Sequence, residues 1–135
     1  MAHDRFIEFE VPPPPDPQWQ ATLTLVGEVI EDFFSGAGTI VWDGDASRWF
    51  ISLPGEGRWA LRRVFPESPR AQAAATASPL ESRERWIEVC VTMGDGLIVD
   101  VLTRHADDFT NALATALAKS LLRMDHAKPM DGAEW

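Results

Sequence analysis

The most reactive side chain in this sequence is the thiol of Cys90, the one cysteine among 135 residues. A catalytic thiol requires a nearby base and electropositive surroundings that lower its pKa. Cys90 instead stands between two valines in an alternating apolar run. A hairpin formed by this run would bring Glu88 and Asp100 close to it, and carboxylates raise the pKa of a thiol. We therefore expect Cys90 to be unreactive.

The patterns that could bind a metal or a cofactor are incomplete. His105 is followed by aspartates at 107–108, but no second His or Cys stands at ligand spacing, and these acids suit the start of a helix. Residues 43–47 open like a calcium loop, yet two of the loop's required positions hold arginine and proline instead of glycine and glutamate. Glycines at 36 and 38 precede a strand-like run, unlike a dinucleotide fingerprint. We predict no cofactor, metal or catalytic residue, and hence a protein that is not an enzyme.

Charge and composition limit the partners. The net charge is −9, and residues 1–57 carry ten acids against two arginines. Phosphate backbones repel such a chain, so we do not expect nucleic acid as a partner, whereas a basic partner or simple solubility would suit it. The single cysteine fits a reducing compartment. No apolar run approaches the roughly 20 residues that span a bilayer. We expect a cytoplasmic protein without membrane contact.

Apolar periodicity predicts a helix near each end of the chain. Asp16 and Pro17 are a favourable N-cap and first helical residue. One apolar stripe follows, formed by Trp19, Leu23, Val26, Ile30, Phe33 and Phe34. The second helix is expected to begin at Asp107 or Asp108 and to end before Pro129, with Lys128 near its C-terminus and a flexible tail over 129–135.

Strand patterns predict the sheet between these helices. Residues 6–11 alternate apolar and acidic side chains, and 39–43 form a second strand. Two hairpins of similar plan follow: 48–61 with glycines at its turn, and 85–102 with a turn at 94–96. A loose crossover over 66–83 separates them. We predict a single α+β domain over 1–135, a two-layer sandwich with five to six antiparallel strands and both helices on one face.

The other face of this sheet is the predicted binding surface. Residues 87, 89, 91 and 93, followed by 97, 99 and 101, are expected to point toward the helices. A sheet covered on one side normally has a polar outer face. Here that face is mixed, and exposed apolar surface on this scale marks a partner site. The alternative is that the crossover and the tail cover it. We predict contact with a partner protein through Phe6, Phe50, Trp86, Ile98 and Leu102.

The order of elements over residues 17–127, with the small size and the acidity, resembles the class I type III secretion chaperones. That resemblance implies a homodimer that binds an extended segment of a partner protein along apolar patches. The strand at 6–11 and the prolines at 12–15 depart from the pattern.

Two alternatives remain open at this point. A strand, a helix, antiparallel strands and a final helix also resemble the helix-grip (Bet v 1/START-like) fold, which implies an apolar ligand cavity between the sheet and the last helix. The chain is one strand short of that fold, and its first helix is unbroken. Charge and size also fit an acidic bacterial immunity or interaction protein.

Overall fold

The computed structural model of the chain describes residues 2–34, 39–53, 85–106 and 108–130. Within these ranges the chain forms two helices and seven strands. In chain order they are β1 (Ala2–His3), β2 (Phe6–Phe9), α1 (Pro17–Phe33), β3 (Thr39–Asp43), β4 (Arg48–Leu53), β5 (Arg85–Met93), β6 (Leu97–Arg104), α4 (Asp108–Leu121) and β7 (Ala127–Pro129).

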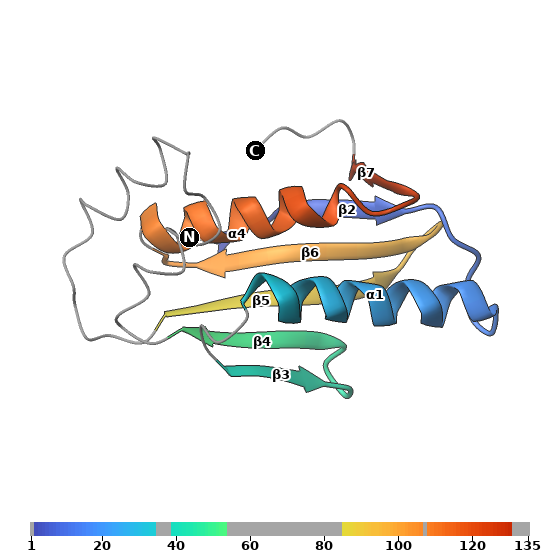
Figure 1. Cartoon of the computed structure of the whole chain (residues 1–135), viewed down its shortest axis with the longest axis horizontal. Coiled ribbons are helices and arrows are strands. Elements are labelled where there is room, and N and C mark those ends of the chain that lie inside the picture. Colours follow the sequence, from blue (N-terminus) through green and yellow to red (C-terminus); the bar gives the residue numbers. More distant parts are fainter. Residues whose placement is uncertain (1, 35–38, 54–84, 107, 131–135) are drawn as a thin grey trace.

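The strands form one antiparallel sheet in the order β3-β4-β5-β6-β2-β7, and β1 pairs with the end of β6. Both helices lie on the same face of this sheet (Figure 1). The described residues therefore form a two-layer α+β sandwich, which confirms the predicted fold class. The sheet has seven strands rather than five or six, because the short strands β1 and β7 add to the predicted ones.

Helix α1 begins where the sequence predicts. The Gln18 N–H donates a hydrogen bond to Oδ1 of Asp16 at 2.8 Å, and Pro17 is the first helical residue. The first turn of a helix leaves N–H groups without partners inside the helix. The Asp16 carboxylate accepts from one of them, and Pro17 has no N–H group to pair. Val26 and Ile30 are fully buried, so the predicted apolar stripe packs on the sheet.

The hairpin of β5 and β6 also forms as predicted, around the turn at 94–96. The Gly94 N–H donates to the Gly96 carbonyl at 2.9 Å. Only glycine fits at position 96, because a Cβ there would lie 2.3 Å from the carbonyl oxygen of Phe9. This close approach fixes the turn against the end of β2.

The strand register separates the two faces of the sheet as predicted. The face under the helices is the core, and its fully buried residues are Ile7, Phe9, Ile51, Ile87, Val89, Leu97, Val99 and Val101. Helix α4 packs on the part of this core formed by β5 and β6, with Leu113, Leu117 and Leu121, each 0% exposed. Met93 was expected to point inward but is 62% exposed, because it is the last residue of β5 before the turn.

The first hairpin differs from its prediction. β4 pairs with β3 on one edge and with β5 on the other, so the hairpin that β4 forms is β3-β4. Its turn is held by Asp43 Oδ1, which accepts hydrogen bonds from the N–H groups of Asp45 (3.1 Å) and Ala46 (3.2 Å). With both edges of β4 occupied, the predicted pairing of residues 48–53 with a return strand at 59–61 is wrong. Residues 54–84, which include the expected crossover 66–83, lie outside the described residues.

Helix α4 is shorter than predicted. It ends at Leu121, and the chain then reverses, with His126 at a φ of 68°. Residues 127–129 pair with β2 as β7 instead of continuing the helix, so Lys128 lies on a strand. Pro129 is tolerated there because an edge strand can do without one ladder N–H. Pro129 therefore lies on a strand and not in the predicted tail, and residues 131–135 lie outside the described residues. Neither described helix is long and apolar enough to cross a bilayer.

Candidate partner-binding surface

The sheet face opposite the helices, here called the open face, carries all five predicted partner-binding residues. The register places Phe6, Phe50, Trp86, Ile98 and Leu102 on it. Trp86 is 44% exposed and Phe6 40% exposed, and Phe50 and Ile98 are half-buried. The rings of Phe50 and Trp86 stack with their centroids 6.5 Å apart. Neither described helix covers this face (Figure 1).

Two side chains change the predicted outline of the open face. Leu102 lies opposite Glu88 but is only 6% exposed, so it offers little area for contact. Val41 is 53% exposed and pairs with Phe50, which places it on the same face. Sequence reasoning identified the strand at 39–43 but missed Val41 as a surface residue. The signal for its face is its distance from Asp43, which pairs with Arg48 across the hairpin. Residues two positions apart on a strand lie on the same face, so Val41 shares the face of Asp43.

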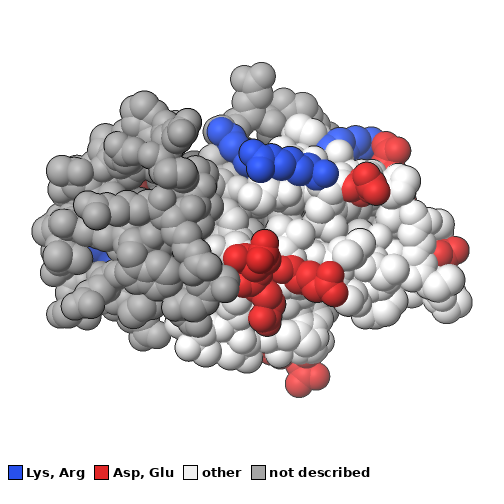
Figure 2. Space-filling model, in the orientation of Figure 1, with Lys and Arg blue, Asp and Glu red and all other residues white. Residues whose placement is uncertain are grey.

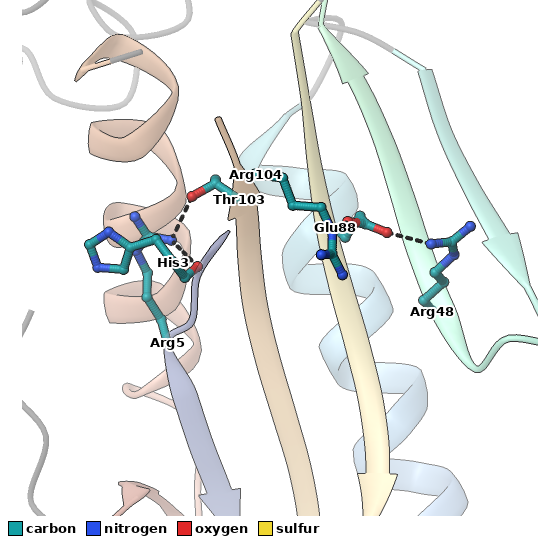
Figure 3. Close-up of polar contacts among 6 residues, drawn as sticks. All are labelled: His3, Arg5, Arg48, Glu88, Thr103 and Arg104. Atoms are coloured by element: carbon teal, nitrogen blue, oxygen red, sulfur yellow. Dashed lines mark hydrogen bonds and ion pairs between the residues drawn. The ribbon is translucent and has the colours of Figure 1, made fainter. Parts of the chain in front are cut away.

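An ion cluster lies among these apolar side chains. Glu88 of β5 is held between Arg48 of β4 and Arg104 of β6 (Figure 3). Arg48 Nη1 donates to Oε1 of Glu88, and Arg104 Nε donates to Oε2 at 3.1 Å. The Glu88 side chain is 6% exposed, whereas those of Arg48 and Arg104 are 37% and 56% exposed. One buried carboxylate thus holds two partly exposed guanidinium groups, and the cluster carries one excess positive charge.

A second polar network, centred on Arg5, joins β6 to α4. Arg5 is fully buried, and its guanidinium points toward α4 (Figure 3). Nε donates to Thr115 Oγ1 at 2.9 Å, and Nη1 donates to Thr103 Oγ1 and to the Val101 carbonyl, each at 3.3 Å. Nη2 donates to the carbonyl and Oδ1 of Asn111 at 3.3 and 3.2 Å. These acceptors are all neutral, so hydrogen bonds rather than an ion pair hold the buried charge.

Asp100 titrates unusually because it lies beside this network. Burial, followed by a hydrogen bond with the Asp4 carboxyl, raises the pKa of Asp100 to about 7. The Arg5 backbone N–H donates to Asp100 Oδ1 at 3.0 Å, which opposes the shift. The hydrogen bond with Asp4 favours the protonated form of Asp100. The open face therefore gains negative charge as the pH rises through neutrality.

Asp100→Asn is expected to flatten the pH dependence of stability. The pKa of Asp100 in the folded protein, about 7, lies above its ordinary value of 3.8, so the folded state binds the extra proton between these limits. The raised pKa of Asp100 therefore lowers the free energy of unfolding as the pH rises from 4 to 7. Asparagine keeps the oxygen that accepts from Arg5 and cannot ionise. Since Asp100 is half-exposed, we expect a gain of only about 1–2 kcal/mol at pH 8 and little change at pH 4.

Urea denaturation at pH 4, 5, 6, 7 and 8 would measure this effect. Asp95→Asn, in the exposed turn after β5, is the matched control and should follow the wild-type profile. Profiles of the wild type and of Asp100→Asn that stay parallel from pH 4 to 8 would contradict the assignment.

Cys90 lies on the open face of the sheet, directly across from Asp100 of β6. Burial, with Glu88 and Asp100 nearby, raises the pKa of the Cys90 thiol, which confirms the predicted surroundings of this cysteine. Among the described residues, no three His, Cys, Asp or Glu side chains gather as metal ligands. Comparisons of the chain with protein-family models, with curated proteins and with solved structures find no match. A proposal of function for this protein therefore has to rest on the geometry of the open face.

Proposed function

We propose that this protein is a non-catalytic protein-binding domain whose open face contacts an extended segment of a partner protein. The observation that carries the proposal is the set of aromatic side chains on that face, Phe6, Phe50 and Trp86, which neither described helix covers. Isolated exposed apolar residues are ordinary, but a contiguous apolar patch with a polar border is typical of an interaction site.

The composition of the open face supports a protein as the partner. Aromatic residues and arginine are enriched at protein interfaces, and this face pairs the Phe50–Trp86 stack with the Arg48–Glu88–Arg104 cluster. A second copy of the chain and a different protein are both compatible with it. The helix-grip alternative has less support, because fully buried leucines of α4 fill the layer between that helix and the sheet.

Replacing the stacked pair is expected to weaken partner binding without unfolding the protein. In Phe50→Ser/Trp86→Ser the lost side chains are exposed or half-buried, so circular dichroism and the melting temperature should change little. Because such aromatic residues dominate interface energies, recovery of the partner in affinity capture from the native host should fall by about tenfold or more. Leu102→Glu is unsuitable as a test, since it would bury a carboxylate beside Glu88.

Leu25→Ser is the matched control, because Leu25 is 51% exposed on α1, on the opposite side of the sheet. The control should recover the same proteins as the wild type. The proposal fails if the double variant recovers them equally well, or if the wild type recovers nothing beyond the level of the uncoated resin. Light scattering after gel filtration of the purified protein would then distinguish a second copy from a different partner.

A further inference from the structure

The sheet ends on one side at β3, and no described strand pairs with the outer edge of that strand (Figure 1). Strands at a sheet edge normally carry lysine, proline or a bulge that keeps other strands away. β3 instead contains three consecutive residues that favour strands, and two of them, Val41 and Trp42, are 53% and 43% exposed. Among the described residues, no lysine or arginine lies over β3 on the face that Figure 2 shows. The side chains of β3 therefore do not block a further strand.

The hydrogen bonds of the sheet determine which backbone groups of β3 point outward. Along a strand of an antiparallel sheet, successive residues bond alternately to the neighbour on one side and to the neighbour on the other. The Val91 N–H donates to the Ser47 carbonyl at 2.8 Å, so the odd-numbered residues of β4 bond to β5 and its even-numbered residues bond to β3. The residues of β3 that bond to β4 are therefore 39, 41 and 43. It follows that Ile40 and Trp42 direct their N–H and carbonyl groups to the outer edge.

The opposite edge of the sheet, at β7, differs from that of β3. The Glu10 N–H donates to the His126 carbonyl at 3.0 Å, and the same alternation then leaves Ala127 and Pro129 pointing outward. The Ala127 N–H already donates to the Met124 carbonyl at 3.3 Å, and proline has no N–H. The outward positions of β7 thus offer no free donor to a further strand, whereas those of β3 offer two.

We propose that β3 pairs with β3 of a second copy of this chain, antiparallel about a twofold axis at Val41. This register places Ile40 opposite the second copy's Trp42, and both of these contacts become hydrogen-bonded pairs. Thr39 faces the second copy's Asp43, so like charges do not meet. A second copy also leaves no open β3 edge, because the joined sheet ends in β7 on both sides. A strand from a different protein would instead present an outer edge of its own.

This pairing would extend the open face. A twofold axis perpendicular to a sheet keeps each face on its own side, so the open faces of the two copies would form one continuous surface. Val41 lies on the open face opposite Phe50, and the two copies of Val41 would join the two copies of Phe50. The inference does not rest on the proposed function, since it uses the edge of β3 and not the open face.

Sedimentation equilibrium of the purified protein tests for the dimer. We expect twice the chain mass of 15.0 kDa at high protein concentration, and dissociation on dilution. Because each copy carries a net charge of −9, added salt should strengthen the dimer by screening the repulsion between the copies. A wild type that stays monomeric up to its solubility limit would overturn the proposal and leave the edge to a strand of a different protein or of the same chain.

A lysine at position 41 tests whether β3 forms the interface. Val41→Lys should weaken the dimer by about tenfold or more, because it places two like charges directly opposite each other. Since Val41 is 53% exposed, the melting temperature should change little. The control Met93→Lys makes the same change in charge at a 62% exposed position of β5, and it should dimerise within about twofold of the wild type. Mixing Val41→Lys with Val41→Glu should restore the dimer. Equal losses in Val41→Lys and Met93→Lys would overturn the interface.

Disulfide trapping tests the register. In a non-hydrogen-bonded antiparallel pair, the opposite Cα atoms lie about 4.5 Å apart, which a disulfide can bridge. Val41→Cys/Cys90→Ser should therefore form a linked dimer on mild oxidation. In the control Thr39→Cys/Cys90→Ser, the two copies of residue 39 would lie about 14 Å apart and should stay reduced. Equal linking of both variants would overturn the pairing centred on Val41.

The variant Phe50→Ser/Trp86→Ser separates this interface from the open face. It should dimerise like the wild type, since neither side chain belongs to β3. Loss of the dimer in this variant would place the interface on the open face and overturn the pairing of β3. Failure of the open-face capture experiment leaves these measurements unaffected, because they use the purified protein alone. The two proposals can therefore fail separately.

Discussion

Replacing Arg5 with alanine is expected to lower the free energy of unfolding by about 3–5 kcal/mol. Arg5 is 0% exposed, and its guanidinium donates to Thr115, to Thr103 and Val101 on β6, and to Asn111 on α4. Alanine would leave these buried acceptors without a donor and would open a cavity between β2 and α4. Both consequences destabilise the same junction.

Urea denaturation at pH 7 would measure the loss, with two variants as references. Arg5→Lys keeps the charge but cannot reach acceptors on both β6 and α4, so it should lose about half as much. Arg123→Ala removes an exposed arginine after α4 and should change the free energy of unfolding by less than about 0.5 kcal/mol. A loss below about 1 kcal/mol in Arg5→Ala would show that the network contributes little net stability.

Local signals in the sequence predicted the parts of the fold that local interactions determine. Asp16 caps α1 through a residue two positions away, and the turn at 94–96 closes the second hairpin within a few residues. The period-two pattern from 85 to 102 identified both faces of the sheet, because alternate residues of a strand necessarily point to opposite sides. The open face followed from the same pattern.

Interactions between distant residues determined what the sequence could not predict. The end of α4 depends on β2, which pairs with residues 127–129 more than a hundred positions later. The burial of Arg5 depends on Thr115 and Asn111, 110 and 106 positions away. Arginine is normally exposed, so no pattern around position 5 indicates a buried network.

The candidate sites divide in the same way. The aromatic residues of the open face could be predicted, because strand alternation places Phe50 and Trp86. The ion cluster around Glu88 could not, because it requires β4, β5 and β6 to lie side by side.

Replacing Glu88 with alanine is expected to lower the free energy of unfolding by about 2–3 kcal/mol. Its side chain is 6% exposed and accepts hydrogen bonds from both Arg48 and Arg104. Removing it would leave two guanidinium groups of like charge facing each other across β5. The loss is smaller than that of Arg5→Ala, since both arginines are partly exposed and water can replace some of their contacts.

The two arginines should share this stabilisation unequally. The Arg104 side chain is 56% exposed, so its pair with Glu88 should contribute about 0.5 kcal/mol in a double-mutant cycle with Arg104→Met. The Arg48 side chain is 37% exposed and its guanidinium lies 5.7 Å from the centre of the Phe50 ring, so we expect a coupling of about 1–2 kcal/mol with Arg48→Met. Urea denaturation of the single and double variants would measure both couplings. Equal couplings would contradict this account, because burial of Arg48 would then not strengthen its pair with Glu88.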